Sequence, residues 1–249
     1  MRDRHAEDWE KLARREPYFA VLTDDRFLGT HGSDEFFASG VADVASLLTS
    51  IASLIGRELK LERVLDFGCG VGRLSIPLAR RAAHVLGCDV APTMLAHARE
   101  NAERAGVRNV EFTTEQPDDL ADEPFDFILS LLVLQHIPTV TGYALFAKLL
   151  ASLAPGGVAA LHVTLRRPGG LLRRIARAIR ARSPFVHRTI SALRGDGRNL
   201  PYMQMNEYDE RVLRRTIDEA GARLAGTIAM QHAEVSAAVL IIERKTRAS

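Results

Sequence analysis

One stretch decides the fold of this chain: Val64-Leu65-Asp66-Phe67-Gly68-Cys69-Gly70-Val71-Gly72-Arg73. An apolar run ends in an acidic residue and then in three glycines at alternate positions, after which a helix-forming segment is expected over 73–83. Glycine lacks a Cβ and adopts positive φ at little cost, so the backbone can turn sharply and approach a ligand closely. The N–H groups that open the following helix then point at that ligand. The stretch therefore predicts a nucleotide-type site at the first crossover of a doubly wound sheet.

The details of this turn indicate the kind of ligand. A dinucleotide site has the pattern Gly-x-Gly-x-x-Gly, whereas here the third glycine comes one residue early, at Gly72. The carboxylate of Asp66 would repel a pyrophosphate and suits a cationic ligand. Residues 66–72 resemble the first motif of the class I S-adenosylmethionine-dependent methyltransferases. The resemblance implies contacts to S-adenosylmethionine from the following residues: Asp66, Phe67, Gly68, Cys69, Gly70 and Arg73.

A second acid follows at the expected distance. Residues 83–89 are predicted to form the second strand and end in Asp89, a little over twenty residues after Asp66. A carboxylate at this place accepts two hydrogen bonds from ribose hydroxyls, and the alternative is a helix-capping acid. The helix predicted from Pro92 to Ala105 comes next. In the family, the places of Val90 and Met94 contact the faces of the adenine, with ordinary packing as the alternative.

The third and fourth strands are predicted over 110–113 and 125–130. In the family the loop after the third strand carries an acid that receives the adenine amino group. That place falls on Glu115 or Gln116, and a Gln side-chain oxygen can accept the same hydrogen bond. Residues 131–138 resemble the fourth motif of the family, which implies that Ser130 and Leu131 contact the cofactor.

His136 lies in that fourth motif, where the loop leaves the carboxyl ends of the strands beside the methyl group. A neutral imidazole can take a hydroxyl or ammonium proton near pH 7, so His136 is the candidate catalytic base. The alternative is a histidine that only braces the loop, as in many related methyltransferases.

Residues 1–60 precede the first strand and are expected to form an N-terminal helical cap. Helices are predicted over 6–15 and 34–55, the second interrupted at Ser39 and Gly40. One interpretation is an extra layer packed on the sheet. The other is a lid that places aromatic side chains over the cofactor, with Tyr18 in contact with it; the lid residues are Trp9, Tyr18 and Phe19.

The second half completes an α/β fold, which the methyltransferase resemblance covers from residue 63 to 244. The predicted domain, 61–249, has a doubly wound, mostly parallel seven-stranded sheet with an antiparallel last strand. The remaining elements are expected as helices over 141–153 and 207–220, a fifth strand over 158–165, and a closing antiparallel hairpin of strands 222–230 and 235–242 at the edge of the sheet.

A basic helical insertion interrupts this pattern over 166–205. It holds ten arginines, all within 166–198, against one acid, Asp196, and apolar residues fall on one helical face. A basic amphipathic helix is typical of a membrane surface contact or an anionic acceptor, and a solvated lid over the active site is the other interpretation. Tyr202 and Gln204 are candidate acceptor contacts. The surface helix also allows a homodimer.

Composition narrows the function. A formal net charge of +2 does not favour a nucleic-acid binder, and two cysteines without metal or disulfide spacing indicate a reducing compartment. No apolar signal segment or run near 18 apolar residues is expected, so we predict a cytoplasmic protein, peripheral at the membrane if the insertion binds it. The predicted activity is methyl transfer to an O or N atom of a small-molecule acceptor by in-line displacement. The alternatives are a lipid-linked, anionic or RNA acceptor and a non-catalytic cofactor-binding protein.

Overall fold

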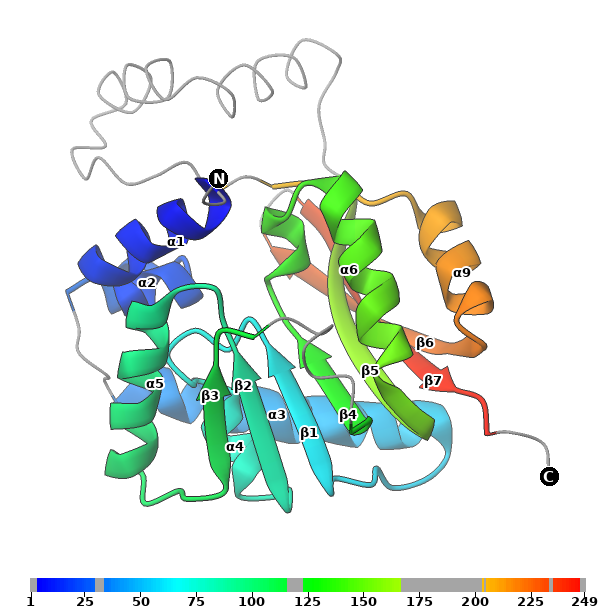
Figure 1. Cartoon of the computed structure of the whole chain (residues 1–249), viewed down its shortest axis with the longest axis horizontal. Helices are drawn as coiled ribbons and strands as arrows, with labels where there is room; N and C mark the ends of the chain where they lie inside the picture. Colours follow the sequence, from blue (N-terminus) through cyan, green and yellow to red (C-terminus); the bar gives the residue numbers. More distant parts are fainter. Residues whose placement is uncertain are drawn as a thin grey trace, which may run out of the picture.

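The computed structural model describes residues 4–29, 34–115, 123–166, 203, 205–232 and 235–246. This part of the chain forms one seven-stranded sheet in the order β3-β2-β1-β4-β5-β7-β6 (Figure 1). The strands are β1 (Arg63–Phe67), β2 (His84–Cys88), β3 (Val110–Thr113), β4 (Phe125–Ser130), β5 (Leu153–Arg166), β6 (Ala222–His232) and β7 (Val235–Arg244). Strands β1 to β5 run parallel and β7 pairs antiparallel with β5 and β6, which confirms the predicted fold class.

Helices cover both faces of the sheet (Figure 1). The helical elements are α1 (Arg4–Arg15), α2 (Pro17–Val21), η1 (Asp25–Phe27), α3 (Asp34–Ile55), α4 (Ser75–Ala79), α5 (Pro92–Arg104), η2 (Leu134–His136), α6 (Thr139–Ala151) and α9 (Glu210–Glu219). Side chains of α3 and α4 pack on one face, against Val64 and Phe127 among others. Those of α6 and α9 pack on the other, against Leu65 and Ile128. Because both faces are covered, the central strands are apolar at almost every position.

Helix α3 is continuous, so the predicted interruption at Ser39 and Gly40 is wrong. Gly40 lies against the backbone of the glycine turn, where a Cβ would stand 2.3 Å from the carbonyl oxygen of Arg73. The glycine therefore permits a close approach of two backbones and does not break the helix. The helix after the turn is also shorter than predicted, since α4 spans only Ser75–Ala79.

Length and composition make α3 the one helix of the described residues that could cross a membrane, contrary to the expectation from sequence. Its Val44 and Ile51 are buried against the sheet. A core helix passes the same test of length and composition, and the packing of these two side chains explains the apolar character of that side of α3.

Tyr208, which lies just before α9, contacts the loop after β4 through its side chain. Its buried hydroxyl lies 2.8 Å from the carbonyl oxygen of Leu134 and 3.1 Å from that of Ile137. Burial raises the pKa of Tyr208, so the phenol stays protonated and can donate. Gly142 on α6 leaves room for the ring, because a Cβ there would stand 1.9 Å from the Tyr208 hydroxyl.

We expect Gly142→Ala to lower the free energy of unfolding by about 1–2 kcal/mol, because the methyl group must push Tyr208 from its two carbonyl partners. Without that contact, alanine within a helix would be stabilising by up to about 1 kcal/mol. Urea unfolding of Gly142→Ala, Tyr208→Phe and the double variant measures the coupling. A stabilised Gly142→Ala protein would show that the contact is not tight.

Candidate active site

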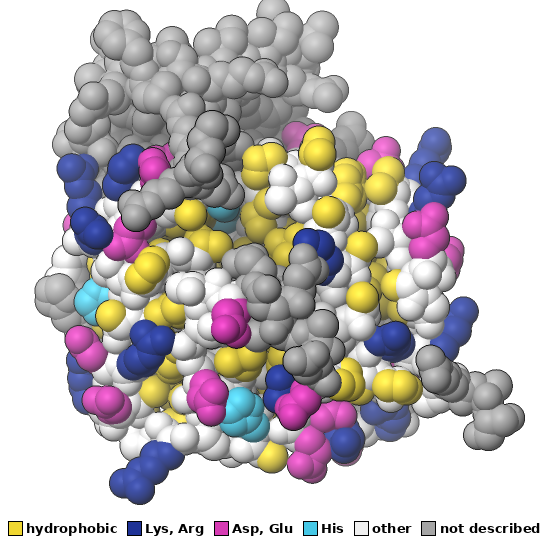
Figure 2. Space-filling model, in the orientation of Figure 1, with side chains coloured by type: hydrophobic (Ala, Val, Ile, Leu, Met, Phe, Trp, Pro, Cys, Tyr) yellow, Lys and Arg dark blue, Asp and Glu magenta, His cyan; other side chains and the backbone are white. Residues whose placement is uncertain are grey.

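A cavity of about 310 Å³ opens at the carboxyl ends of β1, β2 and β4. In the orientation of Figure 1, Figure 2 shows hydrophobic side chains over the middle of the face in view and charged side chains mainly toward its border. The cavity has one part formed by the sheet and α5 and another formed by α1, η2 and α6. The lining residues discussed below are Trp9, Val21, Phe67, Gly68, Gly70, Cys88, Asp89, Val90, Met94, Leu131, Val133, His136, Ile137 and Leu145.

The glycine turn forms the floor of the first part. Gly68 and Gly70 have φ values of 77° and 53°, which favour glycine. A Cβ on Gly68 would stand 2.1 Å from the side chain of Val133, and one on Gly70 would stand 2.6 Å from that of Val21. Here the absence of Cβ atoms lets the loop after β4 and helix α2 approach the turn, in addition to any ligand.

Asp89 lies at the tip of β2 and holds the turn in place. Its Oδ2 accepts a hydrogen bond from the Gly70 N–H at 3.0 Å, and its Oδ1 accepts one from the Ala91 N–H at 2.9 Å. Burial raises the pKa of Asp89, while the backbone hydrogen bonds favour its charged form. A carboxylate oxygen can accept two hydrogen bonds, so each oxygen retains capacity for a ligand hydroxyl. The structural and binding roles of Asp89 are therefore compatible.

Asp66 lies at the end of β1, deeper than Asp89. It is 2% exposed, and its Oδ2 accepts a hydrogen bond from the Ser75 hydroxyl at 2.6 Å. Burial raises the pKa of Asp66 to about 6, although the Ser75 hydrogen bond and the Arg73 charge favour its ionised form. On the neighbouring strand, Ser130 has a buried hydroxyl with no partner among the described residues. A partly compensated carboxylate and an unsatisfied hydroxyl fit a ligand that carries positive charge and hydrogen-bond donors.

His136 and Trp9 form a wall of the other part. His136 is 8% exposed, and its ring lies edge-on to that of Trp9 with centroids 5.2 Å apart. The Nε2 atom of Gln135 lies 3.1 Å from Nε2 of His136. His136 therefore lies beside the cavity, where the sequence placed it.

Helix α1 brings Trp9 to the cavity and is anchored by the residue next to it. Glu10 accepts hydrogen bonds from the Thr93 N–H at 3.2 Å and from the Thr93 hydroxyl at 2.6 Å, in the first turn of α5. Burial opposes ionisation of Glu10, but the hydrogen bonds from Thr93 and Arg14 hold its pKa below the usual value. Glu10 stays charged and holds α1 against α5 near neutral pH.

Comparison with known proteins gives this arrangement a family. Residues 64–157, which include the glycine turn, Asp89 and His136, match the methyltransferase domain family. The described fold is similar to the structure of magnesium protoporphyrin IX methyltransferase from Synechocystis with bound S-adenosylmethionine. The TM-score is 0.60 at 22% identity, over 95% of this chain and 97% of that one. Residues 64–157 therefore contain a methyltransferase domain. The recognition made from the sequence, including its cofactor class, is confirmed.

Curated relatives match the methyltransferase domain over part of their length. A ubiquinone biosynthesis O-methyltransferase from Azorhizobium caulinodans is 45% identical over 86 residues, 34% of this chain and 34% of that protein. One from Dinoroseobacter shibae is 37% identical over 125 residues, 47% of this chain and 50% of that protein. The chain thus spans between about a third and half of the length of these two relatives.

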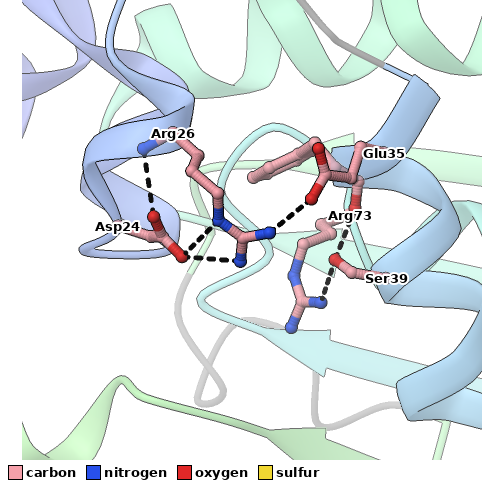
Figure 3. Close-up of polar contacts among 6 residues, drawn as sticks. Asp24, Arg26, Glu35, Ser39 and Arg73 are labelled. Carbon is pink, nitrogen blue, oxygen red and sulfur yellow. Dashed lines mark hydrogen bonds and ion pairs between the residues drawn. The ribbon is translucent and has the colours of Figure 1, made fainter.

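The side chains of two residues assigned to the cofactor do not line the cavity. Tyr18 is buried, and its hydroxyl donates to Oδ1 of Asn101 at 3.3 Å. Arg73 turns toward α3, where its Nη1 lies 3.2 Å from Oγ of Ser39 (Figure 3). The same Nη1 lies 2.7 Å from Oδ2 of Asp43. Neither residue lines the cavity, so the structure shows packing contacts for both side chains, and their contact with the cofactor stays a prediction. The motif fixes their place in the chain, but the direction of each side chain follows from helices packed over the turn.

We expect Arg73→Met to leave the affinity for S-adenosylmethionine within about threefold while lowering the free energy of unfolding by about 1 kcal/mol, since it removes a half-buried ion pair. Arg26→Met is the matched control. Arg26 pairs with Asp24 and Glu35 at the surface, where solvent screens the charges, so we expect Arg26→Met to leave the stability nearly unchanged (Figure 3). Calorimetry and urea unfolding measure both quantities. A tenfold loss of cofactor affinity in Arg73→Met but not in Arg26→Met would show that Arg73 contributes to cofactor binding.

The other assigned residues fall into three groups. Those on the cavity wall are Phe67, Gly68, Gly70, Asp89, Val90, Met94, Leu131 and His136. Those that lie beneath or beside it are Asp66, Cys69 and Ser130, all buried. Gln116, Tyr202 and Gln204 lie outside the described residues, as does most of the arginine-rich insertion. Of the predicted lid residues, Trp9 lines the cavity, whereas Tyr18 and Phe19 do not.

The sequence patterns did not identify several residues that line or support the site. Cys88 lines the cavity, and burial raises its pKa to about 12, so the thiol stays protonated. Ser75 and Gln135 hold Asp66 and His136, but a lone hydroxyl or amide gives no sequence signal. Within the described residues, no group of three or more His, Cys, Asp or Glu side chains is placed to hold a metal ion.

Proposed function

We propose that this chain transfers a methyl group from S-adenosylmethionine to an oxygen atom of a small-molecule acceptor. The observation that carries the proposal is one cavity that joins a nucleoside-type wall at Asp89 to an aromatic wall at Trp9 and His136. The names of the relatives, ubiquinone biosynthesis O-methyltransferases, support oxygen as the methylated atom.

The sheet side of the cavity suits the cofactor. Asp89 would accept hydrogen bonds from the ribose hydroxyls, and Val90 and Met94 would contact the adenine. Asp66 would place negative charge below the cationic end, and the Ser130 hydroxyl would meet a polar group there. When bound, S-adenosylmethionine supplies a methyl group on a sulfonium, which is a good leaving group. The residues of the chain therefore mainly have to position the acceptor and exclude water.

The α1 and α6 side suits a small, partly apolar acceptor. Its walls combine the aromatic ring of Trp9 with the aliphatic side chains of Ile137 and Leu145. Such walls bury a flat ring and leave orientation to a few polar groups, among them His136, whose ring centroid lies 5.2 Å from that of Trp9.

The test uses the full chain with methyl-labelled S-adenosylmethionine, a metabolite extract, and catechol as a simple hydroxylated ring. After the reaction, the label is divided among small molecules, lipid and precipitable polymer. We expect label in small molecules, as an alkali-stable methyl ether or an alkali-labile ester, and none with Asp89→Ala. Label in polymer or on nitrogen, or tight cofactor binding without any transfer, would overturn the proposal.

A further inference from the structure

We propose that Glu10 is a positioning residue for the methyl acceptor: it accepts hydrogen bonds from the first turn of α5 and thereby holds Trp9 at a fixed distance from the cofactor. The functional meaning of this arrangement rests on the proposed methyl transfer, because Trp9 lies in the acceptor wall. The position of Trp9 itself can be measured without cofactor or acceptor.

Helix α5 receives its N-terminal cap from a different helix. Its own N-cap residue, Ala91, has the extended backbone of a cap but no side-chain atom that could accept a hydrogen bond. Pro92 has no N–H, so Thr93 carries the first backbone donor of α5 that needs a partner. Oε2 of Glu10 accepts a hydrogen bond from this N–H at 3.2 Å. A carboxylate at this end of a helix is also favoured by the helix dipole.

The Glu10 carboxylate is held by donors from two helices. Its Oε1 accepts a hydrogen bond from the Thr93 hydroxyl at 2.6 Å and lies 2.9 Å from Nε of Arg14, one turn further along α1. Hydrogen bonds to a charged acceptor are shorter and stronger than those between neutral groups. The Glu10 side chain is only 21% exposed, so water competes less for these bonds than at an open surface.

The link between Glu10 and Thr93 joins the two sides of the cavity. On α1, Trp9 directly precedes Glu10 and lines the side that suits the acceptor. On the other element, Thr93 lies between Val90 and Met94, which line the side that suits the cofactor. The hydrogen bonds from Thr93 to Glu10 therefore set the distance between the acceptor wall and the cofactor wall.

Apolar contacts hold the other half of α1. Leu12 and Ala13 are buried in one cluster with Met94. Loss of the Glu10 carboxylate should therefore leave α1 in place but give its N-terminal half, which carries Trp9, more freedom. An acceptor packed on Trp9 would then be misplaced relative to the methyl group, and a small misplacement of reacting atoms lowers the rate strongly. The cofactor contacts at the strand ends and the glycine turn do not involve this half of the helix.

The first test is the fluorescence of the full chain, because Trp9 is its only tryptophan. We expect Glu10→Ala to shift the emission to longer wavelength and to increase quenching by acrylamide, since the indole becomes more accessible to water. Alanine is the best helix former, so the change does not itself weaken α1. Glu7→Ala makes the same change at an exposed position of α1 and should leave the spectrum unchanged. Wild-type emission and quenching in Glu10→Ala would overturn the proposal.

The second test compares the acceptor with the cofactor. We expect Glu10→Ala to lower kcat/KM for catechol about tenfold, the equivalent of one lost hydrogen bond, and to change the Kd of S-adenosylhomocysteine less than about threefold. A general loss of structure would weaken both. An equal loss for catechol and S-adenosylhomocysteine would therefore contradict a positioning role.

A rescue variant separates positioning from helix capping. Ala91→Ser in the Glu10→Ala protein places a hydroxyl at the N-cap, so the Thr93 N–H regains an acceptor. We expect the thermal stability to recover, while the Trp9 emission and kcat/KM stay at their Glu10→Ala values. Recovery of kcat/KM as well would show that Glu10 acts only as a helix cap.

Thr93 supplies a further comparison if the buried Ala91 does not accept a hydroxyl. Thr93→Val removes the hydroxyl bonded to Glu10 and should shift the Trp9 emission in the same direction as Glu10→Ala, whereas Thr93→Ser should not. Equal spectra for the two variants would contradict the proposal. The expected fluorescence without any methyl transfer would reject only the proposed function. Transfer with wild-type kcat/KM in Glu10→Ala would reject only the role of Glu10.

Discussion

Asp89→Ala should weaken the binding of S-adenosylmethionine by at least about 100-fold. The variant loses a carboxylate that can accept two charge-assisted hydrogen bonds from the ribose, each worth about 1.5–3 kcal/mol. It also frees the N–H groups of Gly70 and Ala91, which now bond to Asp89 at 3.0 and 2.9 Å, so the glycine turn becomes less ordered. Titration calorimetry measures the affinity directly.

Two further variants separate these contributions. Asp89→Asn keeps one acceptor oxygen and should fall between the wild-type protein and Asp89→Ala. Glu100→Ala removes an exposed acid from the same helix that follows Asp89 and should leave the affinity unchanged. If Asp89→Ala binds the cofactor within about threefold of the wild-type protein, Asp89 is a structural residue only.

Asp66→Asn should raise the free energy of unfolding at pH 8 by about 3 kcal/mol, an upper value. Burial raises the pKa of Asp66 from 3.8 to about 6, and each pKa unit corresponds to about 1.4 kcal/mol. The folded state binds the proton more tightly than the unfolded state, so ionised Asp66 destabilises the fold above pH 6. This penalty declines as the pH falls through 6 and is absent below about 4. Urea unfolding should therefore show a larger gain in the free energy of unfolding of Asp66→Asn over the wild-type protein at pH 8 than at pH 4.5.

The same variant should weaken the cofactor complex. S-adenosylmethionine carries a positive sulfur that S-adenosylhomocysteine lacks, so loss of the Asp66 charge should lower the affinity ratio of the two by about tenfold. The neighbouring Ser75→Ala should instead raise the pKa of Asp66 further, because it removes the hydrogen bond at 2.6 Å to the carboxylate. A stability gain in Asp66→Asn that is equal at both pH values would contradict the assigned pKa.

Local sequence determined the elements around the glycine turn. Strands β3 and β4 coincide with the predicted ranges 110–113 and 125–130, because apolar runs bounded by turn residues define buried strands. Asp89 was placed by its distance from Asp66 along the chain, since both strand ends meet at the same edge of a parallel sheet. These features depend on residues that are close in the sequence, so a sequence pattern can predict them.

The remaining features depend on neighbours in space. Gly40 was taken as a helix break because its contact, the Arg73 carbonyl, lies 33 positions further along the chain. Tyr18 and Arg73 were assigned to the cofactor from motifs that give no information about Asn101 and Asp43, with which their side chains hydrogen-bond. Gln135 gave no signal in the sequence because its partner Thr164, on β5, lies 29 positions further along the chain.

The segment that matches the domain family is shorter than the part of the chain that shares one hydrophobic core. The match to the methyltransferase domain family ends at residue 157, the fifth residue of β5, which continues to Arg166 and pairs with β7. Leu213, Leu240 and Ile242 lie beyond that boundary, yet they belong to the same core as Leu65. A fragment cut at the limits of similarity would expose this apolar surface and an unpaired strand edge, which favours aggregation. Anyone who transplants or recombines the cofactor-binding segment therefore has to carry the C-terminal hairpin with it.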